Sequence, residues 1–262
     1  MVSITTFLIY GRDSTGKSSQ LKSICEASEE PIVISLEMKN RRLYGLNAMG
    51  KMTDESPFEV VEPLVIENPP SFVTMPVETY NSMGKVIERI LNNQGPDGKP
   101  KKYKTVVIDG ISDISRWAEK VTIKGLQEKW ERKGKEGDMP VGIGKENLAA
   151  WTVRNNLTCM PLERLAAWAE INGANVFFST LMTPEYLNNA KSGYKMDIQD
   201  RIRDKVCDVR VCLSSDGRGY TARFEKVPNW AEKITNKAGA VTVEMAISEG
   251  GLFMELARRR LL

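Results

Sequence analysis

The chain has 262 residues, of which 41% are hydrophobic and 27% charged, and its formal net charge is +3. These values are ordinary for a globular protein large enough for one α/β domain, and so small a charge neither requires nor excludes a nucleic-acid partner. Because the chain has no histidine, Ser-His-Asp and Cys-His catalysis and histidine-ligated metals are excluded, so catalysis must rest on carboxylates, lysine, arginine and Mg²⁺.

The first predicted elements are a buried strand over Thr5–Tyr10, a loop with the sequence G-R-D-S-T-G-K-S, and a helix over Ser19–Ser28. The loop matches the phosphate-binding pattern G-x-x-x-x-G-K-[ST]. Its strand–loop–helix setting argues against a glycine turn that binds nothing, because backbone N–H groups must converge on phosphates at a helix N-terminus. Lys17 is expected to reach the β and γ phosphates and act in catalysis, and the Ser18 hydroxyl to bind Mg²⁺. The expected nucleotide-binding residues are Gly11, Arg12, Asp13, Ser14, Thr15, Gly16, Lys17, Ser18 and Ser19.

A second buried strand is expected over Ile32–Leu36, and Glu37 follows it directly. Because parallel strands end at one edge of a sheet, Glu37 should lie near the phosphate loop, where it would orient the attacking water. A solvated charge at a strand end is the alternative interpretation. The segment Asn40–Pro76 contains five prolines, so we expect mostly loop, with one edge strand at Val60–Ile66.

The third buried strand is expected over Thr105–Ile108, after a helix at Tyr80–Leu91. Asp109 ends this strand at the same edge of the sheet as the phosphate loop, and there it would hold the water shell of Mg²⁺. The alternative is an N-cap, because a helix follows directly.

Two longer helices are predicted next, over Ile111–Trp130 and over Glu146–Ile171, the second interrupted near Pro161. A fourth buried strand follows at Asn175–Ser179. The segment Met182–Lys205 is longer than ordinary connections, and structureless loops of that length tend to be functional or disordered.

The last third of the chain changes to a period of two residues. Alternation over Cys207–Leu213 and over Tyr220–Glu225 predicts an antiparallel hairpin, followed by a strand at Val241–Ile247 and a basic helix at Leu252–Leu262. The predicted fold class is therefore α/β, with a mainly parallel sheet flanked by helices and an antiparallel C-terminal edge. We expect a single domain over 1–262, with a core over 1–230 and the last strand and helix over 231–262.

Two classes of feature are absent from the sequence. No apolar run approaches the ~20 residues of a membrane-spanning helix, and no secretory leader pattern opens the chain, so a cytoplasmic location without membrane contact is expected. The cysteines form no C-x-x-C pair, which favours reduced thiols in the core over a zinc site; they are Cys25, Cys159, Cys207 and Cys212.

The pattern resembles the RecA-like P-loop ATPase core, and more closely the short phage RecA-like recombinases and single-strand annealing proteins, the phage nucleotide-binding protein family. In that superfamily an acidic residue commonly stands third in the loop and hydroxyl residues follow it, as at Asp13–Thr15. The family's catalytic glutamate matches Glu37 and its Mg²⁺ aspartate matches Asp109. An aromatic residue seven positions after the glutamate stacks on adenine in RecA, and Tyr44 occupies that position.

The resemblance implies ATP and Mg²⁺ as ligands and single-stranded DNA as a partner. By position, Met182–Lys205 matches the second DNA-binding loop of RecA, and single-strand binding combines cations with aromatic stacking. A mobile loop without nucleic acid is the alternative. The expected DNA contacts are Lys191, Tyr194, Lys195, Arg201 and Arg203.

Two further roles rest on the resemblance. RecA couples the γ-phosphate to its DNA loop through a glutamine that ends a strand. Thr180 would have to act as this sensor here, so the resemblance does not imply that ATP controls DNA affinity. Related ATPases complete their site with cations from a neighbouring subunit, and Arg223 and Lys226 match these by rough position, with an exposed strand face as the alternative.

The leading hypothesis is a Mg²⁺-dependent ATPase of the RecA superfamily that binds single-stranded DNA in recombination or strand annealing. The implied partners are further copies of the chain in a ring or short filament and a single-strand-binding protein, in the host cytoplasm for a phage protein. One alternative is a nucleotide-switched regulatory ATPase or helicase loader without direct DNA chemistry. A P-loop kinase of small molecules or nucleotides is a weaker alternative, because the sequence shows no compact lid rich in arginine.

Overall fold

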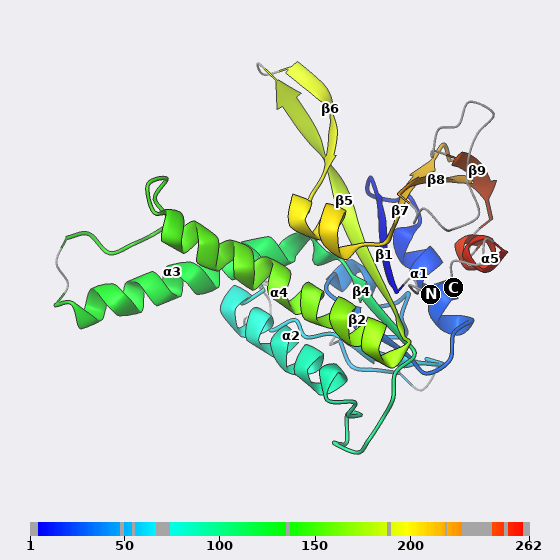
Figure 1. Ribbon diagram of the computed structural model, residues 1–262, viewed down its shortest axis with the longest axis horizontal. Coiled ribbons are helices and arrows are strands. Elements are labelled where there is room, and N and C mark those ends of the chain that lie inside the picture. The colour runs from blue at the N-terminus through cyan, green and yellow to red at the C-terminus, as the bar shows by residue number, and fades with distance from the viewer. Residues whose placement is uncertain are drawn as a thin grey trace.

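A computed structural model describes residues 5–47, 50–53, 56–66, 74–134, 137–187, 190–217, 219–226, 243–248 and 251–258. Within these residues nine strands form one sheet (Figure 1). The strands are β1 (Thr6–Gly11), β2 (Pro31–Ser35), β3 (Glu59–Val61), β4 (Thr105–Asp109), β5 (Asn175–Leu187), β6 (Ala190–Met196), β7 (Val209–Ser215), β8 (Tyr220–Lys226) and β9 (Val243–Ile247).

The strands lie in the order β3-β2-β4-β5-β1-β7-β8-β9, and β6 pairs with β5 off this path. Every neighbour pair from β3 to β7 is parallel, whereas β7–β8 and β8–β9 are antiparallel. The predicted fold class, with four buried parallel strands and an antiparallel C-terminal edge, is therefore confirmed. The four apolar runs form these strands because helices cover both faces of the sheet, so neither face needs polar side chains.

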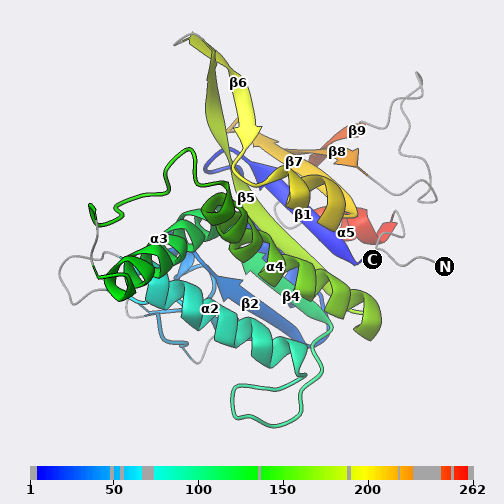
Figure 2. The same ribbon diagram turned by 60° about the vertical axis from the view of Figure 1, so that its left-hand side comes forward.

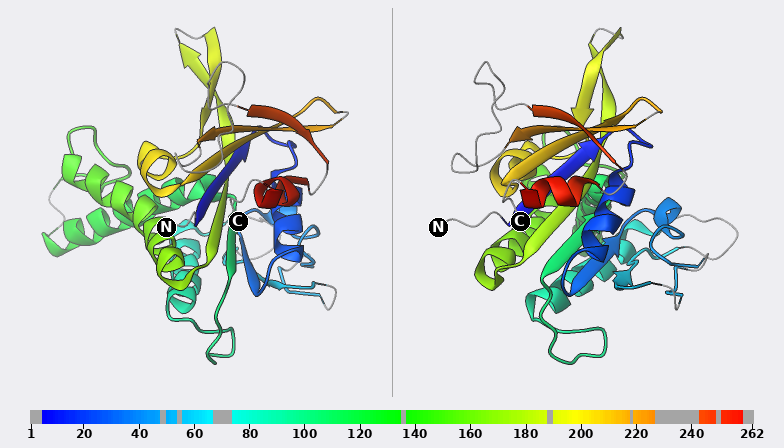
Figure 3. Two further views of the ribbon diagram at one scale, coloured as in Figure 1. Left: turned by 45° about the vertical axis from the view of Figure 1, so that its right-hand side comes forward. Right: turned by 90° about the vertical axis from the view of Figure 1, so that its right-hand side faces the viewer.

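Helices form a layer on each face of the sheet. Figure 2 is seen from the side of one layer, and the left view of Figure 3 shows helices on both sides of the strands. One layer contains α2 (Pro76–Leu91), α3 (Ile114–Arg132) and α4 (Leu148–Asn172), and the other contains α1 (Lys17–Glu26) and α5 (Gly251–Arg258). Successive strand side chains point to opposite faces. In β1, accordingly, Phe7 and Ile9 belong to the core under α1 and α5, and Leu8 belongs to the core under the other layer.

The segment Met182–Lys205 is not the structureless loop expected from the sequence. β5 continues past the sheet to Leu187, and β6 returns antiparallel to it, with Met182 opposite Met196. A π-helix over Arg201–Val206 follows. In Figure 1 this hairpin projects away from the rest of the sheet. Its backbone groups pair with each other, which allows an extended polar segment to stay ordered without a core of its own.

The helix α4 runs through Pro161 without the predicted interruption. Proline has no N–H group, so the carbonyl four residues earlier, that of Leu157, loses its helical partner. The Tyr80 hydroxyl from α2 donates to this carbonyl at 2.6 Å. A contact from a neighbouring helix thus replaces the missing hydrogen bond, which the sequence of α4 alone does not reveal.

Four further expectations concern an edge strand, the cysteines, membrane-spanning helices and the C-terminal helix. The edge strand β3 is shorter than the predicted Val60–Ile66, because Pro63 cannot donate to a strand ladder. All four cysteines are buried thiols that form no disulfide, as expected for the core. None of the helices in the described ranges has the length and apolar character needed to cross a membrane. The end of the predicted C-terminal helix, residues 259–262, lies outside the described residues.

Candidate nucleotide-binding site

The phosphate loop connects the end of β1 to the start of α1 and depends on two glycines. Gly16 adopts a left-handed conformation with φ of 78°, and a Cβ atom there would lie 2.6 Å from the Tyr220 ring. A Cβ atom on Gly11 would lie 2.4 Å from the carbonyl oxygen of Leu213. The loop therefore packs directly against β7 and β8, and its glycines permit both the turn and this close approach.

Lys17 begins α1, and its ammonium group is held inside the loop. The Nζ atom donates to the carbonyl oxygens of Gly11 at 3.1 Å and Arg12 at 2.6 Å. Burial lowers the pKa of Lys17, an effect that the nearby carboxylates of Glu37 and Asp109 oppose. The N-terminus of α1 and this ammonium group together make the pocket suitable for phosphate.

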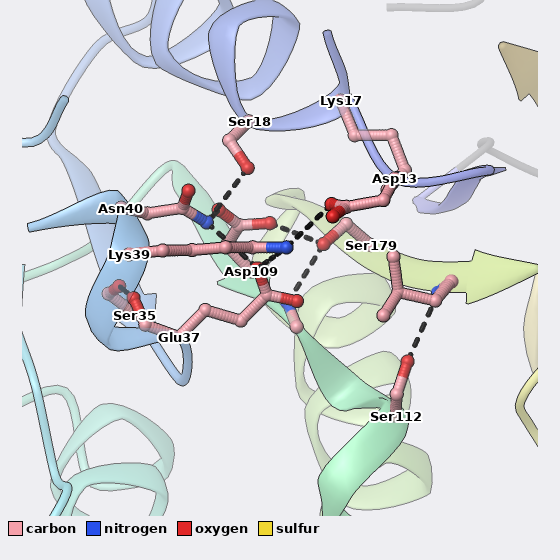
Figure 4. A network of polar contacts seen from close by, with 12 residues as sticks. Asp13, Lys17, Ser18, Ser35, Glu37, Lys39, Asn40, Asp109, Ser112 and Ser179 are labelled. Carbon is pink, nitrogen blue, oxygen red and sulfur yellow. Dashed lines mark hydrogen bonds and ion pairs between the residues drawn. The ribbon is translucent and has the colours of Figure 1, made fainter. Parts of the chain in front are cut away.

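Asp109 lies buried at the end of β4, between the ends of β2 and β5. Its Oδ2 atom accepts hydrogen bonds from Asn40 Nδ2 at 2.9 Å and from the Tyr44 hydroxyl at 2.8 Å. The Ser179 hydroxyl donates to its Oδ1 atom (Figure 4). Three donors, two from the turns after β2 and one from β5, therefore fix the orientation of this carboxylate.

The Asn40 amide joins the residues that were predicted separately from the sequence. Its Nδ2 atom contacts Ser18 Oγ at 2.9 Å, Asp109 Oδ2 at 2.9 Å and Glu37 Oε2 at 3.2 Å (Figure 4). Three oxygen atoms therefore lie around one amide nitrogen, and oxygen is the ligand type that a hard cation prefers. Within the described ranges no group of three or more Asp, Glu, Cys or His could hold a metal, and Mg²⁺ characteristically takes one or two carboxylates together with substrate phosphates.

Glu37 follows β2 and faces the same pocket. Burial raises its pKa, and the negative charge of Asp109 adds to this, whereas Lys39 and Lys17 act in the opposite direction. Gly110 provides room for this side chain, because a Cβ atom at that position would lie 2.5 Å from Glu37 Cγ. A partly buried carboxylate with a raised pKa is suited to accept a proton from water.

Lys39 forms a bridge across the mouth of the pocket. Its Nζ atom lies 2.7 Å from Asp13 Oδ1 on the phosphate loop and 3.3 Å from Glu37 Oε2. Although burial acts against it, the hydrogen bond to Asp13 and the charge of Glu37 raise the pKa of Lys39. The same hydrogen bond lowers the pKa of Asp13.

A cavity of about 230 Å³ lies at the phosphate loop, and the buried Asp109 is not part of its lining. Of the predicted nucleotide-binding residues, Asp13 to Ser19 line it together with Glu37, Lys39 and Asn40, whereas Gly11 and Arg12 do not. The strand order explains the assembly, because β1 and β4 end at the same edge of the sheet and are separated only by β5, which continues past that edge.

Tyr44 is not placed where it could stack on adenine, so the prediction drawn from its spacing is wrong for this conformation. Its side chain is only 1% exposed and packs in the core under α1, and its hydroxyl donates to Asp109. Burial and the negative charge of Asp109 raise its pKa well above the ordinary value. Tyr44 therefore stays protonated and orients the carboxylate.

The predicted sensor and neighbour-subunit residues also have partners within this chain. Thr180 is buried, and its hydroxyl contacts Ser112 Oγ and the carbonyl of Asp197, each at 3.0 Å, so it does not line the nucleotide pocket. Arg223 is held by the Glu225 carboxylate at 2.6 Å. Lys226 donates to backbone carbonyls of residues 204 and 207.

The predicted DNA contacts are separated into different environments. The guanidinium group of Arg12 lies over the ring of Tyr194 on β6, 3.9 Å from the ring centre, so the hairpin contacts the phosphate loop. Lys195 is exposed. Arg201 forms an ion pair with Glu163. Arg203 forms ion pairs with Asp200 and Asp204. The side chain of Lys191 lies outside the described residues.

Sequence reasoning missed three residues that organise the site, namely Lys39, Asn40 and Ser179. Ser179 was placed at the end of a strand but was given no role. Lys39 and Asn40 are two and three positions after Glu37, in the 3₁₀ turn η1 (Met38–Asn40) that folds them back over the pocket. The signal available was their position just beyond a strand end at the edge where the site assembles.

A model of the family described as an AAA domain matches residues 4–234 of the chain. The matched span includes the phosphate loop, Glu37, Asp109 and the whole β5–β6 hairpin. Among curated proteins, no sequence matched the chain.

Proposed function

The chain belongs to the AAA domain family of P-loop ATPases, and from this premise we propose that it is a Mg²⁺-dependent ATPase that couples ATP hydrolysis to the binding of single-stranded DNA in recombination or strand annealing. The observation that carries the coupling is the contact between Arg12 of the phosphate loop and Tyr194 of the hairpin, at 3.9 Å. A change at the phosphates therefore has a direct physical route to the surface that would contact DNA.

The proposed hydrolysis relies on positioning and charge. Lys17 and the N-terminal N–H groups of α1 bind the phosphates, while Glu37 orients a water molecule and accepts its proton. Mg²⁺ that arrives with ATP would be held by Ser18 and by Asp109, and would neutralise charge on the β and γ phosphates. Asn40 donates to the oxygens of Ser18 and Asp109, so it keeps them together before the nucleotide binds.

The proposed DNA surface is the hairpin and the hollow beside it. A polar cavity of about 700 Å³ lies between α4, β6 and the π-helix, and its lining includes Arg154, Lys195, Arg201 and Arg203. The cations of this lining could contact phosphates, and Tyr194 of the same hairpin offers an aromatic ring for a base. Tyr194 would exchange its contact with Arg12 for a base, which makes DNA binding and the state of the phosphate loop mutually dependent.

One set of contacts favours the nucleotide-switched module as a second candidate. Arg201 and Arg203 are already paired with acidic groups of the same chain, so they offer less charge to a DNA backbone than the sequence suggests. In that case the hairpin would engage a protein partner, and the Arg12–Tyr194 contact would transmit the nucleotide state to it.

The test is steady-state ATP hydrolysis with Mg²⁺, with and without a single-stranded oligonucleotide, for the wild type and for Glu37→Gln and Tyr194→Ala. We expect DNA to stimulate the wild type, Glu37→Gln to bind ATP without hydrolysing it, and Tyr194→Ala to hydrolyse ATP without stimulation. Lys195→Ala should weaken oligonucleotide binding, measured by fluorescence anisotropy, and leave ATP affinity unchanged. If the oligonucleotide neither binds nor alters hydrolysis, the DNA proposal is wrong and the protein-directed module replaces it.

A further inference from the structure

The nucleotide pocket contains a second ammonium group besides that of Lys17. Lys39 stands in the 3₁₀ turn after Glu37, and its side chain extends across the pocket toward Asp13 (Figure 4). The Nζ atom lies 2.7 Å from Asp13 Oδ1 and 3.3 Å from Glu37 Oε2. The charge therefore lies over the phosphate loop and beside the carboxylate that would accept the proton.

The contact between Lys39 and Asp13 is one that a nucleotide can displace. The two side chains are 52% and 73% exposed, and exposed ion pairs of this kind are screened by water and weak. A bound triphosphate would place several negative charges beside the same ammonium group. Because attraction grows with charge, the phosphate becomes the preferred partner of Lys39.

The other cations near the site have partners in the described structure, and Lys17 among them already binds the phosphates in the proposed function. Lys17 donates to two carbonyls of the phosphate loop. Arg223, expected to act on a neighbouring subunit, is bound to Glu225, and Lys226 donates to two backbone carbonyls. Arg12 lies over an aromatic ring of the hairpin. Lys39 lines the nucleotide cavity, and among these cations it is the one whose ion pair is weak.

We propose that Lys39 is a catalytic residue of ATP hydrolysis, an inference that rests on the proposed function: when ATP binds, its ammonium group leaves Asp13 and binds an oxygen of the γ-phosphate. In the reaction, Glu37 accepts one proton from water, and the water oxygen forms a bond to the γ-phosphorus. The bond from that phosphorus to the β–γ bridging oxygen breaks, and its electron pair stays on ADP. Lys39 keeps its protons throughout and offsets the negative charge on the transferred phosphoryl group.

The movement of Lys39 also changes the environment of Glu37. In the structure the ammonium group contacts Glu37 Oε2, and this contact makes the carboxylate a weaker base, because it stabilises the charged form against protonation. Transfer of the ammonium group to the phosphate removes the contact at the moment when the carboxylate must take a proton. Lys39 thereby links the arrival of the γ-phosphate to the loss of its own contact with Glu37.

The test compares Lys39→Met and Lys39→Arg with Lys22→Met, a control in which the lysine pairs only with Glu26 on the surface of α1, at 3.5 Å. Hydrolysis is measured together with the affinities for ADP and for a non-hydrolysable ATP analogue, by fluorescence. Lys39→Met should lower kcat about 10²–10³-fold, leave ADP affinity unchanged and weaken analogue binding relative to ADP. Lys39→Arg should recover part of kcat, and Lys22→Met should match the wild type.

Two outcomes separate this inference from the function on which it rests. If Lys39→Met keeps the wild-type kcat and the wild-type ratio of analogue to ADP affinity, Lys39 only tethers the loop through Asp13 and the inference is overturned. If the wild type hydrolyses no ATP, the proposed function fails, but the same affinity ratio still tests the contact with the γ-phosphate. Unchanged ADP affinity shows in each case that the variant is folded.

Discussion

Replacing Tyr44 by phenylalanine removes one hydroxyl group and keeps the aromatic ring, so it separates two roles for this residue. In the structure the hydroxyl donates to Asp109 Oδ2 at 2.8 Å inside the core. A buried hydrogen bond to a charged acceptor contributes about 1.5–3 kcal/mol. For a domain of this size, its loss should lower Tm by about 3–12 °C. Because Asp109 also loses one of its donors, we expect the Mg²⁺ requirement for hydrolysis to rise about tenfold or more.

The assays are thermal unfolding and hydrolysis titrated with Mg²⁺, and Tyr80→Phe is the matched control. That variant removes a hydroxyl that donates to the neutral Leu157 carbonyl at 2.6 Å, and neither residue lines the nucleotide cavity. It should cost about 0.5–1.5 kcal/mol and leave the Mg²⁺ response unchanged. If Tyr44 instead stacked on adenine, phenylalanine would preserve the stacking. Wild-type stability and wild-type Mg²⁺ dependence of Tyr44→Phe would therefore refute the role derived from the structure.

Three further predictions concern the loop, the base and the support of the site. Gly16→Ala should abolish ADP binding and destabilise the fold by at least about 1–2 kcal/mol. Gly217 has a similar φ but open space around it, so Gly217→Ala should lower stability and leave ADP binding intact. The pKa of Glu37 is raised, and its charged form is the base. A plot of kcat/KM against pH should therefore fall toward low pH with an apparent pKa above the usual carboxyl range, and a fall at the usual carboxyl pKa would contradict this. Arg41→Ala should lower the free energy of unfolding by about 3–5 kcal/mol, measured in denaturant, because it leaves the Glu62 side chain, which is only 2% exposed, without its ion pair. Adding Glu62→Gln to this variant removes the unpaired charge and should recover part of the loss.

The sequence predicted the parts of the fold that depend on local pattern. The parallel strands were recognisable because helices cover both of their faces, which requires continuous apolar runs such as those of β1 and β4. The phosphate loop was recognisable because its glycines stand at positions where the Cβ atom of any other residue would clash with neighbouring atoms. Glu37 and Asp109 were located by one rule, that parallel strands end at the same edge of a sheet.

The features that the sequence did not predict depend on contacts between distant segments. The continuity of α4 through Pro161 requires a hydroxyl from another helix, that of Tyr80. The hairpin of β5 and β6 has no apolar alternation, because its strands pair with each other and not with a core. Tyr44 has the spacing of a base-stacking residue, but a 3₁₀ turn before it directs the ring into the core.

The position of β1 in the middle of the sheet has a consequence for the synthesis of the protein. β1 pairs with β5 and β7, and the backbone N–H of Thr5 donates to the carboxylate of Asp208, 203 positions later in the sequence. At the usual rates of translation, roughly 10–40 s separate the appearance of these two residues on the ribosome. For that time the nascent chain carries a complete phosphate-loop sequence but no folded pocket around it. Its apolar first strand must wait for late neighbours, so β1 is the segment that a chaperone would be expected to shield.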